Sequence, residues 1–282
     1  MFDGQFYPGL QPQFDGFAQL RRPYYRARLK DVLTTLGLTT NLKLCLDAAD
    51  GNSLPAASTK WLDTSGGGYD FFRGTTAGAD ATDPTINGTS DGRTSSEYLS
   101  FDGGDYLTYD TTNETWMTNI HKDNAKWTVA IWAWYGSAAS NGIGGTSGNN
   151  VASVGFHFGM SGGQRWFAAI NNGSGVVALQ NIMVATLATG SWVFAVSSLD
   201  EAVGANGHIL GVNSTFELFS STYSSPSAAG ATNTMQIGSR GNAQVPLVNT
   251  SRMAAMAIWE GTALTQAQLD GIFQATRKRF GV

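Results

Sequence analysis

The sequence predicts a mostly β protein, an antiparallel β-sandwich with an extended N-terminal arm and short flanking helices. Glycine makes up 35 of the 282 residues, without a three-residue period, which indicates many tight turns. Short apolar segments recur between these turns, several with alternating hydrophobicity, as in antiparallel sheets. Charged residues are 13% and aromatic residues 11% of the chain, so it can bury enough apolar surface to offset its ordering entropy.

The composition also excludes several classes of protein. No run approaches the ~18 consecutive apolar residues of a membrane span, and residues 1–5 lack the basic start and apolar run of a secretory signal. A single cysteine, Cys45, can form neither an intrachain disulfide nor a thiolate metal site. The net charge of −4 argues against a general nucleic-acid binder. We therefore expect no membrane partner, no nucleic-acid partner and no cofactor.

Residues 1–40 form the first predicted domain, an anchoring arm with a short helix. Three prolines and the absence of a stable period predict an extended start, and basic residues cluster between 21 and 30. Each exposed phenylalanine would forgo about 1.5–3 kcal/mol of burial, so we expect the arm to lie against a surface. That surface is either its own domain or, as we favour, an acidic partner. The expected partner contacts are Phe2, Phe6, Tyr7, Phe14, Phe17, Arg21 and Arg22.

Residues 41–282 form the second predicted domain, the sandwich. The helix before it, residues 27–36, shows apolar residues at helical spacing and ends at a glycine. Residues 42–47 alternate between apolar and other side chains, as in a strand with one buried face. Residues 48–96 are rich in glycine, threonine, aspartate and serine, which predicts long loops with short strands near Trp61 and residues 71–72.

Most strands are predicted after residue 97. Segments 127–135 and 252–259 are apolar on both faces, so we expect central strands that are covered on both sides. Glycine pairs such as Gly144–Gly145 are predicted as turns. The predicted strands are residues 98–101, 106–109, 127–135, 154–158, 165–170, 176–182, 192–197, 208–212, 234–237 and 252–259.

A C-terminal helix is the last predicted element. Thr265 and Gln268 have the spacing of a capping box, and Leu264 can pack against Leu269 as a hydrophobic staple. Basic residues 277–279 stand at the end of this helix, where the helix dipole favours cations.

Three groups of segments carry a family resemblance. The first group is residues 42–47 with the Asp-Gly-Asn turn and Trp61-Leu62-Asp63. The second group is YLSFDGGDYL at 98–107 with WTVAIW at 127–132. The third group is MQIGSR at 235–240 with residues 253–259 and LTQAQL at 264–269. Together they resemble the concanavalin A-like lectin/glucanase superfamily in its laminin-G-like form. The resemblance covers about residues 41–282 and implies a jelly roll, often with a carbohydrate or protein ligand on the concave face or edge loops.

An aromatic arm before a lectin-like sandwich also resembles a bacteriophage virion component. This resemblance implies a non-enzymatic structural protein of the virion, in capsid decoration, tail, baseplate or fibre. Its partners would be other virion proteins and further copies of itself. Two alternatives stay open. One is a carbohydrate-binding adhesin or receptor-binding module that recognises a cell-surface glycan; the other is a polysaccharide hydrolase or lyase.

The sequence argues against catalysis. Glucanases of the superfamily carry a Glu-x-Asp-x-x-Glu strand motif, whose carboxylates flank the bond to be cleaved. None of the five glutamates here has an aspartate two residues on. His121, His157 and His208 are not accompanied by a Gly-x-Ser-x-Gly nucleophile elbow, so we expect them to be structural. We therefore predict that the protein is not an enzyme.

Two sets of residues are candidates for ligand binding. The oxygen ligands that calcium prefers are present in two groups, Asp47, Asp50 and Asn52, and Asp102 and Asp105. Aspartate and asparagine beside glycine are also ordinary turn formers, so we predict no metal site. Trp61, Tyr69, Trp116 and Trp166 lie near predicted loops, where an aromatic face can stack on a sugar. The alternative for these rings is a place in the core.

Overall fold

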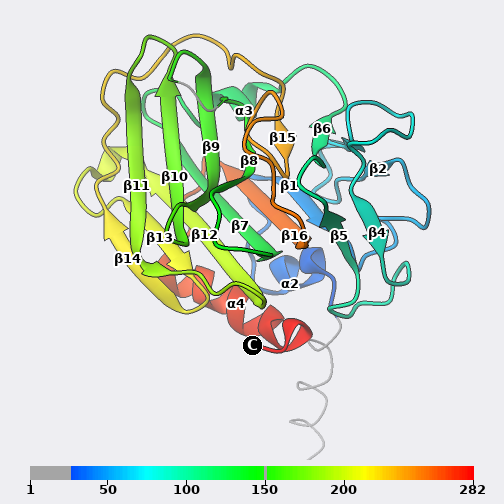
Figure 1. Ribbon diagram of the computed structural model, residues 1–282. Coiled ribbons are helices and arrows are strands. Elements are labelled where there is room, and N and C mark those ends of the chain that lie inside the picture. The colour runs from blue at the N-terminus through cyan, green and yellow to red at the C-terminus, as the bar shows by residue number, and fades with distance from the viewer. Residues whose placement is uncertain (1–26, 149–150) are drawn as a thin grey trace, which may run out of the picture.

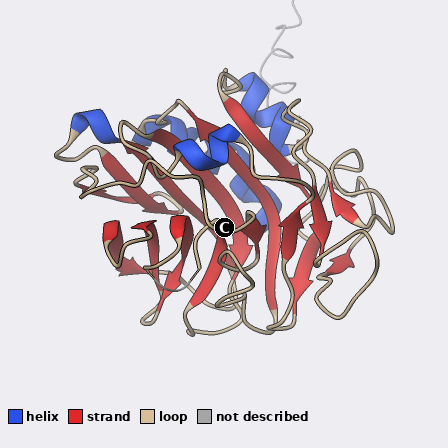
Figure 2. Ribbon diagram, turned by 90° about the horizontal axis from the view of Figure 1, so that it is seen from above, coloured by secondary structure: helices blue, strands red, loops and turns tan. Residues whose placement is uncertain are grey.

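The computed structural model describes residues 27–148 and 151–282 of the chain. The partner contacts predicted in the arm, from Phe2 to Arg22, lie outside the described residues. Within the described ranges the chain forms two eight-stranded antiparallel sheets that pack face to face. Strands make up the body of the molecule and the few helices lie around it, as Figures 1 and 2 show. The predicted fold class is confirmed.

The first sheet has the order β14-β13-β12-β7-β16-β5-β4, and β1 pairs with β16 beside β5. The strands of this sheet are β14 (Thr215–Phe219), β13 (His208–Val212), β12 (Trp192–Asp200), β7 (Lys126–Trp134), β16 (Ser251–Glu260), β5 (Tyr98–Phe101), β4 (Thr85–Asn87) and β1 (Leu42–Asp47). The long strand β16 therefore has β7 on one side, and β1 and β5 share its other side.

The second sheet has the order β11-β10-β9-β8-β15-β6-β3-β2. The strands of this sheet are β11 (Val177–Thr186), β10 (Arg165–Asn172), β9 (Val154–Ser161), β8 (Asn141–Gly145), β15 (Gln236–Ile237), β6 (Leu107–Tyr109), β3 (Phe71–Arg73) and β2 (Lys60–Trp61). The helices are α2 (Leu29–Thr35), α3 (Thr115–Asn119), the 3₁₀ turn η2 (Glu201–Val203) and α4 (Gln266–Phe280). None of the helices in the described ranges has the length and hydrophobicity that crossing a membrane requires.

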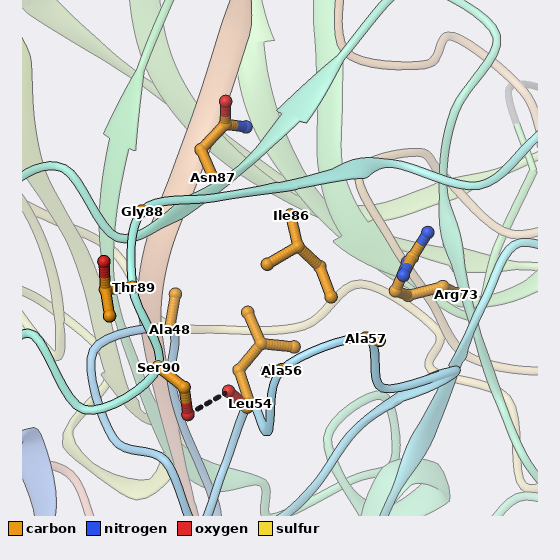
Figure 3. Close-up of a pocket in the computed structure, with 10 residues that line it drawn as sticks. All are labelled: Ala48, Leu54, Ala56, Ala57, Arg73, Ile86, Asn87, Gly88, Thr89 and Ser90. Carbon is orange, nitrogen blue, oxygen red and sulfur yellow. Dashed lines mark hydrogen bonds between the residues drawn. The ribbon is translucent and has the colours of Figure 1, made fainter.

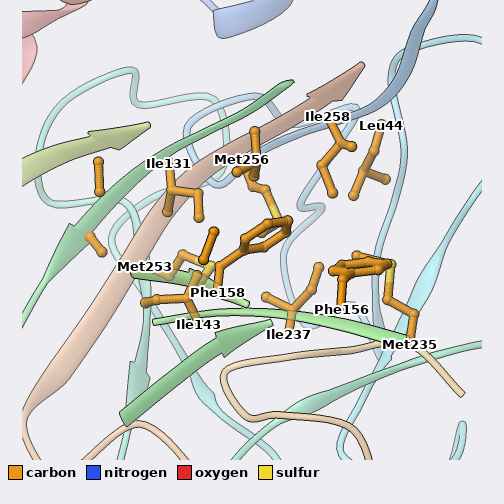
Figure 4. Packing of buried hydrophobic residues seen from close by; sticks show 14 of the residues in the cluster. Leu44, Ile131, Ile143, Phe156, Phe158, Met235, Ile237, Met253, Met256 and Ile258 are labelled. Carbon is orange, nitrogen blue, oxygen red and sulfur yellow. The ribbon is translucent and has the colours of Figure 1, made fainter. Parts of the chain in front are cut away.

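The main core lies between the two sheets. Strand residues alternate between faces, so Ile131 of β7 and Met256 and Ile258 of β16 point toward the second sheet. There they belong to the same buried cluster as Phe156 and Phe158 of β9 (Figure 4). This cluster joins strands that are far apart in sequence.

A second core covers the opposite face of the first sheet. Its residues come from β7, β12 and β16 on one side and from α2 and α4 on the other. Alanines at 254, 255 and 257 of β16 leave room for the helices to approach, and the ring of Phe280 stacks on Trp132 at 4.0 Å. Strands β7 and β16 are therefore central and covered on both faces, which confirms the prediction from their two-sided hydrophobicity.

A buried ion pair fixes both helices to β1. Asp47 is 1% exposed, and its Oδ1 lies 2.8 Å from Nη1 of Arg279 in α4. The other carboxylate oxygen accepts the backbone N–H of Leu29 at the start of α2. Arg279 also donates from Nε to the backbone oxygen of Thr94. One carboxylate thus joins β1, α2 and α4, and its arginine partner adds the loop before β5.

The two sheets are joined at one margin by a side chain. In β11, residues 183–185 form a bulge where the pairing register with β10 shifts. Glu217 of β14, the last strand of the first sheet, accepts the N–H groups of Val184 and Ala185 at 2.8 Å each. A carboxylate from one sheet therefore satisfies the backbone donors that the bulge leaves unpaired in the other sheet.

The capping box predicted for the C-terminal helix is confirmed. Thr265 caps α4 through the backbone of Gln268, whose side chain returns to the Thr265 backbone, and the basic residues 277–279 lie in the last turn. Leu264 and Leu269 are both buried in the second core. The short helix predicted at residues 27–36 is α2, and Cys45 is buried as a free thiol.

The prediction of a turn at Gly144–Gly145 is wrong, because these residues belong to β8. A Cβ at Gly142 would lie 2.6 Å from the backbone nitrogen of Arg240, and one at Gly144 would lie 3.0 Å from the backbone oxygen of Gln236. The glycines of β8 are therefore needed because neighbouring backbone comes too close for a side chain. Strand β14 and helix α3 were also not predicted.

We expect Asp47→Ala to lower the free energy of unfolding by about 3–5 kcal/mol, because it leaves the Arg279 charge buried without a partner. Urea unfolding would measure the loss. The control is Lys126→Ala, which breaks a 2.6 Å ion pair whose lysine side chain is 44% exposed and should cost less than about 1 kcal/mol. Equal costs for the two variants would show that the Asp47–Arg279 pair does not hold the helices in place.

Candidate functional site

Three of the four aromatic residues considered for sugar stacking are in the core. Trp61, Trp116 and Trp166 are 0%, 4% and 0% exposed. The indole N–H of Trp166 donates to the backbone oxygen of Val196 in the other sheet. The stacking interpretation is therefore wrong for these tryptophans, and the core alternative is correct. Tyr69 is half-buried and packs against Trp116, with ring centres 5.6 Å apart.

The three histidines are buried in hydrogen-bonded positions. His208 lies 2.8 Å from the hydroxyl of Ser197 and 2.7 Å from the side-chain nitrogen of Asn181. That nitrogen also donates to the backbone oxygen of Ser220, so the amide donates to His208 Nδ1 and the ring proton is on Nε2, facing Ser197. Burial lowers the pKa of His208 to about 3. In this arrangement His208 donates to Ser197 and does not accept its proton as a general base would.

The aspartates considered for calcium are engaged within the protein. Asp47 pairs with Arg279, and Asp50 lies 3.2 Å from the guanidinium of Arg28. Asp102 accepts the N–H of Gly104, and Asp105 accepts the N–H of Asp102, as turn-forming aspartates do. No group of three or more histidine, cysteine, aspartate or glutamate residues in the described part of the chain is arranged to hold a metal.

The outer face of the second sheet is covered where β9 and β10 cross it. His157 and Asn171 face away from the main core but are only 4% and 3% exposed. Phe167 beside them is 2% exposed, and the guanidinium of Arg240 lies 5.3 Å from its ring centre. The outer face of the second sheet is therefore covered by the protein's own side chains at these strands.

One depression, of about 520 Å³, lies between Lys122, Asp123 and residues 226–228. Two others lie on either side of the edge strand β4. The first, of about 360 Å³, lies between β4 and the loop that follows β1 (Figure 3). Its walls combine Leu54, Ile86 and three alanines with Asn87, Thr89 and Ser90. Arg73 at its side donates to the backbone oxygens of Pro84 and Ser58. No aromatic ring lines this depression, so it lacks a flat apolar surface for stacking on a sugar.

The second depression, of about 300 Å³, has a different chemistry. A cross-strand row crosses the outer face of the first sheet, because Thr85, Ser100, Arg252, Trp134 and Trp192 stand opposite one another on neighbouring strands. Residues in such a row point to the same face. Helix α4 covers Trp192 at one end of the row through Phe280, and the rest is partly open. The depression is lined by Thr85, Asn87, Tyr98, Ser100, Phe101, Asp102, Asp105, Asn249, Thr250 and Arg252.

Arg252 is held between aromatic rings. Its guanidinium carbon lies 4.7 Å from the ring centre of Tyr98 and 4.6 Å from that of Trp134. All three side chains are half-buried. Asn87, in the row beside Tyr98, donates its amide N–H to Ser100 and to the backbone oxygen of Thr85, which leaves its side-chain oxygen directed elsewhere. A ring, a guanidinium, an amide and hydroxyls therefore converge on one depression, which we call the Tyr98–Arg252 site.

Asp105 is a buried titratable group of this site. Its side chain is 5% exposed, and burial raises the pKa of its carboxyl to about 6, with a further rise from the charge of Asp102. Asp102 itself is exposed. The site therefore has one exposed carboxylate and one buried carboxyl that gains a proton in mildly acidic solution.

Sequence reasoning missed most of this site. It named Asp102 and Asp105, but as a calcium candidate, and it did not single out Tyr98, Asn87 or Arg252. The signal that could have found them is Arg252 at the start of a strand whose other residues are apolar. An arginine at such a place needs a partner or an opening to solvent.

Comparisons with known proteins identify no family. No protein-family model matches the chain, and no curated protein matches it. Solved structures match over most of it. The botulinum neurotoxin serotype D binding domain aligns with a TM-score of 0.57 and 12% identity, over 84% of this chain and 52% of the toxin chain.

Two carbohydrate-processing enzymes contribute further matches. Domain 4 of a GH43 extracellular arabinanase from Geobacillus stearothermophilus, in complex with arabinotriose, has a TM-score of 0.54, 12% identity and coverage of 83% of this chain and 98% of that one. Trypanosoma rangeli sialidase in complex with sialic acid has a TM-score of 0.53 and 11% identity, over 92% of this chain and 39% of the sialidase. At these identities the likeness shows a shared β-sandwich fold.

We expect the stability of Asp105→Asn to rise relative to the unmodified protein as the pH increases. The folded-state pKa of Asp105 is about 6, above the ~3.9 of an unfolded aspartate, so its contribution to stability is fully present below about pH 4 and lost as the pH rises through about 6. Urea unfolding at pH 4.5 and 7.5 should show a gain of about 1–3 kcal/mol for the variant between these values.

The control for this prediction is Asp80→Asn. Hydrogen bonds from Thr82 lower the pKa of the Asp80 carboxyl, so this variant should change in the opposite direction over a lower pH range. Parallel pH profiles for Asp105→Asn and the unmodified protein would contradict the raised pKa of Asp105.

Proposed function

We propose that the protein is a non-catalytic carbohydrate-binding domain that recognises a cell-surface glycan through the Tyr98–Arg252 site. The observation that carries the proposal is the convergence, in one depression, of a half-exposed ring with amide, hydroxyl, carboxylate and guanidinium groups. Binding sites of this kind combine apolar surface with a few polar groups that fix the orientation of the ligand.

Each group at the site suits one part of a sugar. The ring of Tyr98 can cover an apolar C–H face, and the oxygens of Asn87 and Asp102 can accept from hydroxyls. The backbone of β4 and β5 holds Asn87 beside Tyr98 through strand pairing, so these groups are positioned before the ligand arrives. Solved structures of the same fold include one in complex with arabinotriose, which supports a glycan as the ligand.

The proposal includes no reaction. In the buried Ser197–His208 pair the ring proton of His208 faces Ser197, so the histidine cannot take the proton of the serine hydroxyl. The two aspartates of the site, Asp102 and Asp105, lie on one loop, three residues apart. Glycoside cleavage needs two carboxyl groups on opposite sides of the bond. These features favour binding over the hydrolase or lyase alternative.

We further propose that this domain is attached to a bacteriophage virion through residues 1–40. The described part of this segment, from residue 27, contributes α2 to the second core. Residues 1–26 are then the part available to join capsid, tail or baseplate proteins and other copies of the chain.

We expect Tyr98→Ala to lower the affinity for a bound glycan by about tenfold or more, which corresponds to about 1.4 kcal/mol. A glycan array would first identify the ligand, and calorimetry would compare the variants. Tyr98→Phe should bind nearly as well as the unmodified protein, because it keeps the ring.

The matched control is Phe72→Ala, which removes another half-buried ring under a cation, in the second sheet, where Lys60 lies 4.8 Å from the ring centre. If both alanine variants bind equally well, the glycan does not occupy the Tyr98–Arg252 site. An array without any bound glycan would refute the proposed function.

Deletion of residues 1–20 tests the virion part of the proposal. The truncated chain should keep its circular dichroism spectrum and unfolding midpoint, because the two cores can be built from residues 29–282. It should be missing from purified particles when expressed with the other virion proteins. Normal incorporation of the truncated chain would contradict anchoring by the arm.

A further inference from the structure

We propose that the glycan bound at the Tyr98–Arg252 site is acidic, and that Arg252 binds the carboxylate of a sialic or uronic acid unit. This inference rests on the proposed function and names the class of its ligand. It is carried by the surroundings of Arg252, a half-buried cation that lies between two rings and beside no anion.

The guanidinium of Arg252 forms no ion pair with a carboxylate of the described residues. Within residues 27–148 and 151–282, no aspartate or glutamate oxygen lies within 4.0 Å of its guanidinium nitrogens, and no hydrogen bond from them to the protein is present. Asp102 and Asp105 line the same depression, but their carboxylates accept backbone N–H groups of their own loop.

Other arginines of the chain show the usual arrangement. Arg279 pairs with Asp47 at 2.8 Å, Arg28 lies 3.2 Å from Asp50, and Arg73 combines backbone oxygens with Asp83 at 3.8 Å. At these three positions the guanidinium is at least half-buried and has a carboxylate oxygen within 4.0 Å. Arg252 is partly desolvated by its rings, which makes an anionic ligand group the missing partner.

The shape of the guanidinium selects a carboxylate. The rings of Tyr98 and Trp134 contact the guanidinium by cation–π attraction and restrict its rotation. Its N–H groups form a planar fork, which matches the two coplanar oxygens of a carboxylate in a bidentate pair. The neighbouring Asn87 and Ser100 can contact the hydroxyls of the same sugar ring.

The experiment compares sugars that differ only in charge. The full-length protein would be titrated by calorimetry with 3′-sialyllactose against lactose, and with trigalacturonic acid against its carboxyl-reduced form. We expect at least one acidic sugar to bind about tenfold or more tightly than its neutral partner, as a bidentate charged pair would give. The preference should weaken as the salt concentration rises.

Three variants assign the preference to Arg252. Arg252→Gln should lose the preference for the acidic sugar, so that it binds the acidic sugar and its neutral partner with affinities within about twofold of each other. Arg252→Lys should lose most of the preference, because it keeps the charge but not the fork. Arg165→Gln removes a positive charge at an exposed position on the second sheet and should behave as the unmodified protein. Circular dichroism would confirm that each variant is folded.

The outcomes separate this inference from the proposed function. Equal binding of acidic and neutral sugars would overturn the inference while the carbohydrate-binding function stands. Equal tightening by 3′-sulfolactose would overturn the assignment of a carboxylate in favour of any anion. Failure of every sugar to bind at millimolar concentration would overturn both proposals.

Discussion

The ion pair between Asp47 and Arg279 is the contact on which the arrangement of the molecule depends. It connects the first strand of the sandwich to the last helix, two parts of the chain separated by more than 200 residues. The same carboxylate accepts the backbone N–H of Leu29 at the start of α2. With both helices fixed, the second core closes over Trp132 and Trp259, whose indole N–H groups bond to Thr276 and to the Leu38 backbone. Helix α4 ends at Phe280, and the outer face of the first sheet beyond this residue is only partly covered.

Most of the fold could be predicted because its signals are local. Two-sided hydrophobicity marked β7 and β16 as central, and Thr265 with Gln268 marked the start of α4. Strand β8 could not be predicted, since its glycines resemble a turn and are explained only by the backbone of Arg240 and Gln236 packed against them. Strand β14 follows a two-residue turn at 213–214, a weak signal. The virion resemblance of the arm stays a prediction.

The site was harder to predict than the fold because it depends on strand order. Asn87, Tyr98 and Arg252 become neighbours only because β4, β5 and β16 pair in that order. Sequence reasoning ranked tryptophans near loops, but Trp61 and Trp166 are buried, since large rings are needed between the sheets. The half-buried rings that matter lie where α4 ends. The proposed binding function therefore depends on the incomplete coverage of the first sheet by α4.

The carboxylate of Glu217 has a consequence for how this edge of the sandwich meets other polypeptides. The unpaired backbone groups of an edge strand can pair with a strand of another polypeptide. The exposed side chains of Val184 and Leu218 would favour such pairing. Here the bulge bends the margin, and a negatively charged side chain already occupies its backbone donors. This edge is therefore less able to pair with a strand of another molecule. Replacing Glu217 would free these backbone donors and favour strand pairing between molecules, without removing a contact with ligand.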